Sequence, residues 1–327
     1  MRLIVGVDIG GTNVVVGTLA EDGSAIYGLR KERTRTNDGP DAVVQQIAAM
    51  VEQSLEATGT ALAREDLDVV GVGIGSPGPL DTKQGIVLMT PNLGWRDFPL
   101  RDRVSEAVGL PATLDNDANC AIFGEWWRGG ARGARVVVGL TIGTGIGGGI
   151  VLDGRVFHGA SDIAGEIGHM SIDSTGRRCK CGNYGCLEAY ASGTAIAARA
   201  IEGLEAGQES GLPERVNGNL GTITAQVVYD AAHDGDEYAL EVIQDTAHFL
   251  GTGVANLINI FNPEIVVICG GVTAAGERLF GPLRKEVARR AFKPAVEVCR
   301  IVPGTLPGTA GVHGAVAAFK VQSWGEA

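Results

Sequence analysis

Two stretches of the chain share one pattern, in which an apolar strand runs into a glycine turn and then into a second strand rather than a helix. The first stretch covers residues 2–30 and the second covers residues 135–160. In both, the β-branched run after the glycines and a further turn predict a hairpin. A third strand followed by glycines lies at residues 265–271. This is the one internal repeat visible in the sequence. Because a strand and not a helix follows the glycines, the repeat restricts which kinds of nucleotide-binding loop they can form.

Glycine is so common here that a short glycine motif carries little weight, because 50 of the 327 residues are Gly. About one match to G-x-G-x-x-G is expected by chance, and the chain has two. They are Gly73/Gly75/Gly78 and Gly143/Gly145/Gly148. A dinucleotide-binding loop must open a helix, whereas Pro79 follows the first match and a strand follows the second. The pattern therefore argues against a nicotinamide-dependent dehydrogenase, and no Lys follows a Gly, which excludes a P-loop.

A glycine tip between two strands offers another way to bind phosphate, because tight turns expose consecutive backbone N–H groups. Gly10–Gly11 and Gly143–Gly145 are such tips, and Thr12 and Thr144 add hydroxyl donors. Asp8 ends the strand before the first tip and is a candidate ligand for Mg²⁺. Ordinary hairpin turns remain the alternative for either tip alone.

Three cysteines lie within eight residues, at Cys179, Cys181 and Cys186, and His169 precedes them. Such a triplet is expected by chance only about 0.002 times, and Cys₃His is a closed set for structural zinc. The zinc would hold the loop that leads to Glu188. A redox disulfide or free buried thiols are the alternatives.

Short amides and carboxylates beside glycine or proline form a further group, suited to a ligand with many hydroxyls. Its members are Asn92, Asn116, Asp117, Glu166 and Glu188. Asp117 stands where a helix begins, so it is either an N-cap or a general base, and the residues alone leave this open. Asp115 is interpreted as an N-cap. Four histidines have no partner visible in the sequence and are interpreted as structural: His158, His233, His248 and His313.

The charge balance disfavours nucleic acid as a partner, because the net charge is −11 and no basic stripe is present. No apolar run approaches the ~20 residues of a membrane span. The N-terminal apolar run is short and broken by Asp8, unlike a signal peptide. We therefore expect no membrane partner and a cytoplasmic location.

Helical spacing of apolar residues, with start and stop signals, predicts six helices and leaves a polar loop over residues 203–221. The helices are expected over residues 41–55, 99–108, 115–127, 194–205, 224–260 and 310–321. Strands are expected at residues 2–8, 14–19, 26–30, 69–74, 111–114, 135–142, 150–152, 155–157 and 265–271.

The motifs together resemble those of the ROK family (repressors, uncharacterised reading frames and kinases), and the match runs nearly end to end. Asp8-x-Gly10-Gly11-Thr12-Asn13 is similar to the first phosphate motif of that family, and Thr141-x-Gly143-Thr144-Gly145 to the second. Gly270–Gly271 resembles its adenosine motif, Asn116–Asn119 its catalytic motif, and Glu166-x-x-His169 its sugar-and-zinc motif. Pro91-Asn92-Leu93 together with Gly185–Glu188 is most like the bacterial ATP-dependent glucokinases of the family.

The resemblance implies a fold class, the α/β, two-lobed actin/hexokinase-like ATPase fold, which is ribonuclease-H-like and has duplicated mixed-sheet domains. The smaller lobe would comprise residues 1–115 plus 305–327, because the last helix returns to it. The larger lobe would comprise residues 116–304. The two lobes would close over a sugar and exclude water.

The activity implied is transfer of the γ-phosphoryl group of ATP to a hexose, glucose at its 6-hydroxyl, with Asp117 as the general base. Residues implied at the sugar are Gly78 in the glycine-rich Gly71–Gly78 segment, Asn92, Asn116, Asp117, Glu166, His169 and Glu188. Residues implied at ATP and Mg²⁺ are Asp8, Gly10, Gly11, Thr12, Asn13, Thr141, Gly143, Thr144, Gly145, Gly270 and Gly271. Structural Zn²⁺ would be held by His169, Cys179, Cys181 and Cys186.

Two departures from the family pattern and several alternatives remain. Asp115 stands where many relatives have Glu, and the Ser76–Pro79 loop differs from several relatives and bears on the choice of sugar. The alternatives are a kinase for mannose, fructose or an N-acetyl amino sugar, a polyphosphate-dependent kinase, and a non-catalytic sugar-sensing regulator. Family repressors carry an N-terminal helix-turn-helix, for which Asp8 leaves no room. Relatives imply a homodimer or homotetramer.

Overall fold

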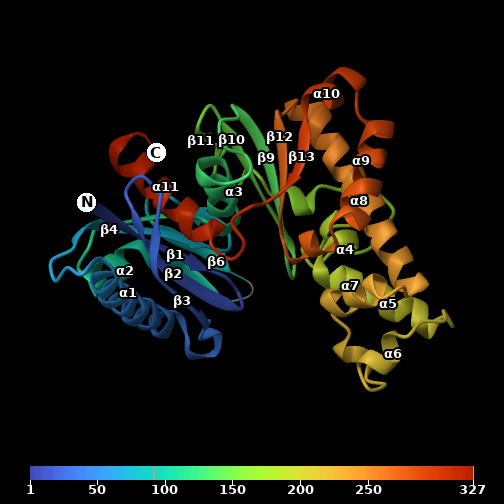
Figure 1. Cartoon of the computed structure of the whole chain (residues 1–327), viewed down its shortest axis with the longest axis horizontal. Coiled ribbons are helices and arrows are strands. Elements are labelled where there is room, and N and C mark those ends of the chain that lie inside the picture. The colour runs from blue at the N-terminus through green and yellow to red at the C-terminus, as the bar shows by residue number, and fades with distance from the viewer. Residues whose placement is uncertain (91–92, 327) are drawn as a thin grey trace. The chain divides into compact units, whose positions relative to one another are not determined.

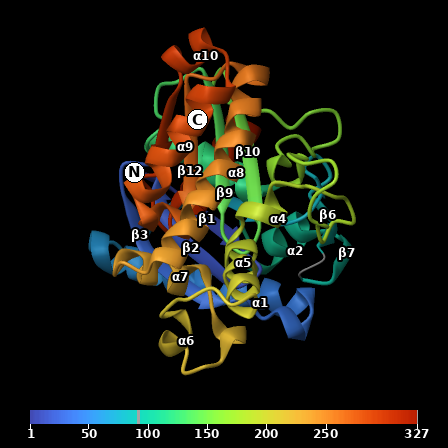
Figure 2. The same ribbon diagram turned by 90° about the vertical axis from the view of Figure 1, so that its right-hand side faces the viewer.

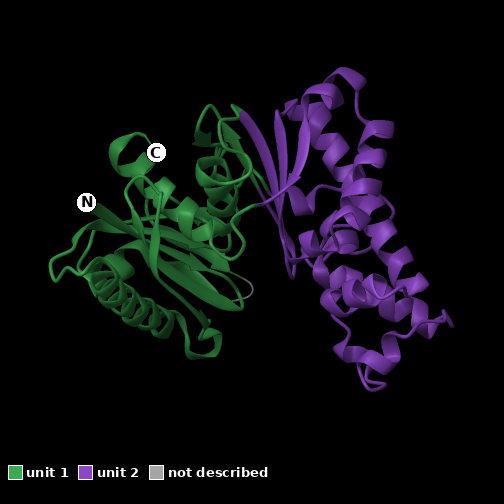
Figure 3. Cartoon of the chain, viewed as in Figure 1, with its two compact units in different colours: residues 1–135, 149–165, 305–327 green, residues 136–148, 166–304 purple. Residues whose placement is uncertain are grey.

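The computed structural model describes residues 1–90 and 93–326, which divide into two compact units. Unit 1 comprises residues 1–135, 149–165 and 305–327, and unit 2 comprises residues 136–148 and 166–304 (Figure 3). These contact-defined units differ from the predicted lobes in the assignment of residues 116–135 and 149–165. The predicted lobe bounds therefore stay a prediction.

Unit 1 is built on a mixed five-stranded sheet of order β3-β2-β1-β4-β8. The strands are β1 (Arg2–Ile9), β2 (Asn13–Ala20), β3 (Ile26–Arg33), β4 (Asp68–Ser76) and β8 (Ala112–Asn116). β1, β2 and β3 form an antiparallel meander, whereas β4 and β8 run parallel to β1. The first predicted strand–tip–hairpin unit thus forms three of the five strands, and the parallel strands β4 and β8 complete the sheet.

Two helices, α1 (Pro40–Leu62) and α2 (Leu100–Val108), cover one face of this sheet (Figure 1). α1 begins at Gly39–Pro40, and Pro is favoured at the first helical position. Its buried residues recur at spacings of three and four along the helix, as at Val43, Val44, Ile47 and Met50. They join Val5, Val7, Ile9, Val72 and Ile74 in one hydrophobic core.

The other face of the unit 1 sheet receives α11 (Ala310–Trp324), which also packs on α3 (Asp117–Arg128). In β4, Gly71, Gly73 and Gly75 alternate with buried β-branched residues, so one face of the strand carries no side chains. A Cβ at Gly73 would overlap the carbonyl oxygen of Ala315. The predicted glycine-rich segment Gly71–Gly78 is therefore mainly a strand that α11 approaches closely, and only its end is a loop.

A second five-stranded sheet has the order β11-β10-β9-β12-β13 and repeats the arrangement of the first. Its strands are β9 (Val136–Ile142), β10 (Ile146–Leu152), β11 (Arg155–Val156), β12 (Ile265–Gly270) and β13 (Arg300–Pro303). β12 runs parallel to both β9 and β13. The predicted internal repeat is thus visible as repeated sheet topology, and the predicted α/β class with duplicated mixed sheets is confirmed.

Helices of unit 2 pack beside β9 and β12, with α8 (Glu237–Phe261) at their centre (Figure 2). α8 contacts α7 (Ala225–His233) and α9 (Glu277–Arg290). The helical stretch predicted over residues 224–260 is divided into two helices, because Gly235 has a φ of +97° and Asp236 caps α8 through the N–H of Ala239. The chain therefore breaks between α7 and α8.

The remaining elements are short, apart from α5 (Gly193–Glu205). They are β5 (Leu80–Asp81), β6 (Ile86–Thr90), β7 (Trp95–Phe98), α4 (Glu188–Ala191), α6 (Leu212–Arg215) and α10 (Lys293–Val298). Single turns of 3₁₀ helix lie at Thr36–Asp38, Ile167–His169, Leu220–Thr222 and Gly271–Ala275. No helix in the described part of the chain combines the length and the apolar character that a membrane crossing requires.

Candidate functional site

Three strand ends of unit 1 meet at one sheet edge, which we call the unit 1 edge. Because β1, β4 and β8 are parallel, their carboxyl ends lie side by side. In the register, Asp8 lies opposite Gly75, and Gly75 lies opposite Asp115. Asn116 and Asp117 follow directly. The fold thus gathers the predicted Mg²⁺ ligand and the predicted catalytic motif at this edge.

The first glycine tip joins β1 to β2 at the unit 1 edge. Gly10 N–H donates to the carbonyl of Asn13 at 2.8 Å, which closes the turn. Thr34 holds the tip from β3, since its hydroxyl donates to the Gly10 carbonyl at 2.7 Å. Gly11 and Thr12 stay exposed. The tip therefore presents backbone to solvent on a supported turn, as a phosphate cradle requires.

Asp8 is half-buried at the end of β1 in surroundings that disfavour its charge. Burial, and then the negative charge of Asp117, raise the pKa of Asp8 to about 7. α11 approaches so closely that a Cβ at Gly311 would overlap the Asp8 carboxylate. A divalent cation would relieve this cost, and a carboxylate pair is a hard-oxygen donor set that suits Mg²⁺.

Asn116, not Asp115 or Asp117, is the N-cap of α3. Its side-chain oxygen accepts from the N–H groups of Ala118 at 2.9 Å and Asn119 at 3.1 Å. Asp117 is the first residue of the helix, and its Oδ1 also accepts from Ala118 N–H, at 2.9 Å. The predicted N-cap role of Asp115 is wrong, because this residue ends β8 and is buried. Asp117 is therefore not the N-cap, and it lies half-buried at the helix start.

The second glycine tip joins β9 to β10 in unit 2, with Thr141 in the strand that leads to it. Gly143 N–H donates to the Gly145 carbonyl at 3.0 Å. The start of α5 supports this tip, since Gly193 N–H donates to the Gly143 carbonyl at 2.8 Å. Thr194 donates to the Thr144 carbonyl, also at 2.8 Å. Gly143 and Thr144 are exposed, so the two predicted phosphate tips share one construction.

The predicted adenosine turn lies next to the second tip, because β12 pairs with β9 and Gly270 lies opposite Ile142. Gly270 has a φ of +101°, and a Cβ there would overlap the Ile142 carbonyl. Gly271 opens the 3₁₀ turn that follows, and a Cβ at Gly271 would meet no atom of the described residues within 4 Å. The backbone at this strand end therefore leaves room for a ligand beside the second tip.

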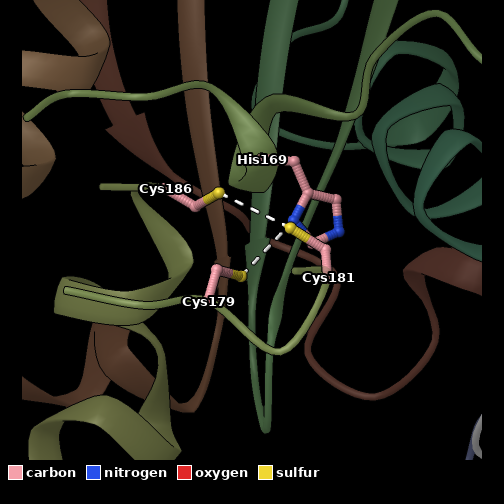
Figure 4. Close-up of side chains that lie close together, drawn as sticks. All are labelled: His169, Cys179, Cys181 and Cys186. Carbon is pink, nitrogen blue, oxygen red and sulfur yellow. Dashed lines mark hydrogen bonds between the residues drawn. The ribbon is translucent and has the colours of Figure 1, made fainter. Parts of the chain in front are cut away.

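His169, Cys179, Cys181 and Cys186 come together in unit 2 (Figure 4). Their ligand atoms all lie within 4.8 Å of one another. His169 Nδ1 is 3.8 Å from Cys179 Sγ, and the Sγ atoms of Cys181 and Cys186 are 3.7 Å apart. Zn–S bonds of about 2.3 Å in a tetrahedron place ligand atoms about 3.8 Å apart. The four residues therefore fit tetrahedral zinc.

The loop around this cluster is folded by its own backbone. Cys179 N–H donates to the Asn183 carbonyl at 2.8 Å, and Gly182 N–H donates to the Cys179 carbonyl at 3.0 Å. Burial raises the pKa of Cys186 to about 12, whereas the N–H of Asn183 lowers the pKa of Cys181. A bound cation would stabilise the thiolate form of all three cysteines.

Glu188 links the metal cluster to the second tip. Its Oε2 accepts from Ile146 N–H at 2.9 Å, and Cys179 Sγ lies 3.9 Å from its Oε1. A Cβ at Gly145 would overlap the same carboxylate, so a larger residue there would displace the Glu188 side chain from its present position. Glu166 is exposed one turn before His169, and its carbonyl accepts from His169 N–H at 3.1 Å. Unit 2 thus brings Glu188, the tip and the cluster into one connected group.

Two further predicted sugar residues have different outcomes. Gly78 has a φ of +97°, and a Cβ there would overlap the Met89 carbonyl, so its backbone conformation needs glycine. Asn92 lies outside the described residues.

Sequence reasoning missed the partner of His158, which it interpreted as structural. His158 Nε2 lies 3.0 Å from Asp115 Oδ1 and 2.9 Å from Oδ2. The two residues are 43 positions apart, and no spacing signals the pair. The one available hint is an acidic residue directly before the Asn116–Asp117 motif.

The chain belongs to the ROK family, whose model matches residues 4–322. A glucokinase of Halalkalibacterium halodurans is 40% identical over 96% of this chain and 93% of its own length. The solved ROK family glucokinase of Streptomyces griseus, in complex with glucose and AMPPNP, is 35% identical, with a TM-score of 0.83 over 96% of this chain and 98% of that one.

The family also contains regulators. A putative xylose repressor of Caldicellulosiruptor is 34% identical over 96% of this chain, which covers 77% of that protein. The fold is thus the two-domain ROK/hexokinase-like fold. The Cys/His cluster is typical of the zinc motif of the family.

Proposed function

We propose that this protein is a hexose kinase that transfers the γ-phosphoryl group of ATP to the 6-hydroxyl of glucose. The observation that carries the proposal is the unit 1 edge, where the half-buried Asp117 at the start of α3 shares a strand-end cluster with Asp8 and an exposed glycine tip. Glucokinases among the relatives support the choice of glucose.

Asp117 is the general base of the proposed reaction. Its carboxylate accepts the proton of the sugar hydroxyl as that oxygen attacks the γ-phosphorus. The N–H of Ala118, at 2.9 Å from Oδ1, fixes the orientation of this carboxylate at the start of α3. Asn116 contributes to the sugar site, together with Gly78 and Asn92.

The two glycine tips bind the phosphates of ATP in this proposal, and Gly270–Gly271 adjoins the adenosine. Phosphoryl transfer depends mainly on positioning and on neutralising charge, which backbone N–H groups provide without a basic cleft. Asp8 is the residue that would hold Mg²⁺, alone or through water. When bound, the ion offsets negative charge on the phosphate oxygens.

The zinc cluster has a structural part in the proposal. His169, Cys179, Cys181 and Cys186 would fill all four positions of the metal, so no position is left to activate water. The cluster instead holds Glu188, which with Glu166 and His169 is proposed to contact the sugar.

A coupled assay with purified protein tests the proposal. The acceptors are glucose, mannose, fructose, N-acetylglucosamine and N-acetylmannosamine, each tried with ATP, ADP and polyphosphate. We expect the highest kcat/KM for glucose with ATP. A preference of more than about tenfold for another sugar would replace glucose as the substrate, and no turnover on any hexose would refute a kinase.

A sugar-sensing regulator is the second candidate, because repressors are among the relatives. It predicts that glucose or another sugar binds and raises the unfolding temperature, while no ATP is consumed. The same purified protein distinguishes the two functions, since only a kinase produces ADP in proportion to the sugar.

A further inference from the structure

We propose that His158 is a positioning residue for the catalytic pair Asn116 and Asp117, acting as an imidazolium clamp on the buried carboxylate of Asp115. The inference rests on the proposed function and deepens it. It concerns how unit 1 holds the base in place.

Asp115 is the link between the clamp and the base. Its carboxylate is 2% exposed, and the same Oδ1 that faces His158 accepts the backbone N–H of Asn116 at 2.8 Å. This bond lies where β8 passes into α3, one residue before Asp117. Any rotation of the Asp115 side chain would therefore release the backbone that sets the direction of the catalytic pair.

A buried carboxylate needs charged or strongly polar partners to remain ionised. His158 supplies the closest side-chain partner, with Nε2 within 3.0 Å of both oxygens. The amide nitrogens of Asn119 and of Gln322, on α11, lie farther away, both at 3.5 Å. Removing His158 would thus leave the carboxylate with one short hydrogen bond, that of its neighbour Asn116.

The surroundings of the ring favour its doubly protonated form. The nearby backbone of Val156 also favours the charged ring. Nε2 lies within 3.0 Å of both Asp115 oxygens, and a hydrogen bond between two charged groups is stronger than one from a neutral imidazole. The charged groups acting on His158 are Asp115, from β8, and Asp162, from its own loop, and both are acidic. Burial alone lowers the pKa of His158, but the bonds to Asp115 and Val156 and the two charges raise it above its usual value.

The loop that carries His158 is tied down on its far side. The carboxylate of Asp162 accepts from the N–H and from the hydroxyl of Thr82, both at 2.9 Å. Within the loop, Ala164 N–H donates to the His158 carbonyl at 3.1 Å. The ring is thus held at Asp115 by a loop with fixed ends, as a positioning residue requires.

A pH dependence follows from the raised pKa. Below the ordinary pKa of histidine the ring is doubly protonated and the clamp is complete. As the pH rises through the raised pKa, the His158 ring loses its charge and one N–H donor. Asn116 and Asp117 are then held less firmly in position. We therefore expect kcat to fall on the alkaline side because of His158.

The experiment compares the wild-type protein with His158→Gln and His158→Ala, and uses His248→Gln as the control, an exposed histidine on α8. We expect His158→Ala to lower kcat on the order of 10- to 100-fold, with KM for ATP nearly unchanged, because misplaced groups slow the chemical step. The Gln side chain retains an N–H donor but carries no charge. The His158→Gln variant should therefore lose less activity than His158→Ala, and its kcat should not fall at alkaline pH because of residue 158. The control should match the wild type.

Long-range ¹H–¹⁵N NMR of the wild-type histidines provides a readout that needs neither turnover nor a stable variant. We expect the ring of His158 to lose its second proton at a pH above 6.5, the ordinary pKa of histidine. Loss of that proton below the ordinary pKa, or an unchanged kcat profile in His158→Gln, would overturn the inference. A wild-type protein that phosphorylates no sugar would instead refute the proposed function, and the NMR result would still report on the clamp.

Discussion

At the scale of single residues, the position of Asp8 lowers the stability of the fold when its carboxylate is charged. The proposed binding of Mg²⁺ explains why an acidic residue is found there. Its pKa, raised to about 7 mainly by burial, means that the folded protein holds the proton more tightly than the unfolded chain does. The fold is therefore most favourable at this residue below the ordinary pKa of Asp. That advantage is lost as the pH rises through about 7.

We predict that Asp8→Asn raises the unfolding temperature of the metal-free protein at pH 8 by at least about 2 °C and raises it clearly less at pH 5. The same variant should lose nearly all turnover. Differential scanning calorimetry at the two pH values measures the first effect, and Asp66→Asn, an exposed loop residue, is the control. Equal unfolding temperatures for wild type and Asp8→Asn at pH 8 would refute the buried-charge argument.

Single residues also mark the limit of what the sequence could predict. The metal cluster was predictable from the rarity and close spacing of its cysteines, Cys179, Cys181 and Cys186. The glycine tips were predictable because each follows a strand. Asp115 and His158 give no such signal, because only the order of strands in the sheet and the path of the later loop bring them together. The closeness of Gly311 to Asp8 is hidden for the same reason.

At the scale of elements, the metal loop predicts a measurable dependence on zinc. We expect one zinc per chain in freshly purified protein, and an unfolding temperature at least about 5 °C lower after chelation, because the four ligands close the loop that carries Glu188. Cys179→Ser should reproduce the loss. Cys299→Ser, at a half-buried cysteine outside the cluster, should not. Metal-free protein with unchanged stability and activity would refute a structural zinc.

The close contact of β4 with α11 gives a second prediction at this scale. Gly73→Ala should destabilise the protein by about 2–3 kcal/mol, because the new methyl group would overlap the Ala315 carbonyl and α11 would have to shift. Gly281→Ala is the matched control, since a methyl group on this helical glycine in α9 would meet, among the described residues, only a carboxylate oxygen of Glu277, 3.8 Å away. The control should change the stability by less than about 1 kcal/mol, because the gain in helix propensity is offset by the steric restriction that Pro282 places on the residue before it. Urea unfolding measures both, and equal effects would contradict the packing argument.

Elements with strong periodicity were predictable and weakly patterned ones were not. α1 and the strands of the unit 1 sheet were predicted close to their observed bounds, although α1 extends to Leu62. α9 was missed because it is polar overall and contains Pro282. β5 and β7 were missed because two to four residues show no alternation.

At the scale of the whole molecule, the repeated sheet order explains why two similar tips occur in one chain. Each tip connects the first two strands of a five-stranded sheet with the same order, and each is supported by a neighbouring segment of its own unit. The sequence identity between the two repeats is low because few residues are needed to specify the arrangement. A β-branched strand, a glycine turn and a second strand are sufficient. The sheet topology shows the duplication that sequence identity obscures.

The most direct test of the proposed kinase is phosphorus NMR of glucose and ATP·Mg²⁺ incubated with the wild-type protein and with Asp117→Asn. For the wild type we expect glucose 6-phosphate and ADP in equal amounts. For Asp117→Asn we expect a rate lower by about 10²- to 10⁴-fold, with glucose binding retained in calorimetry. No glucose 6-phosphate from the wild type, or near-normal turnover by Asp117→Asn, would contradict the proposal.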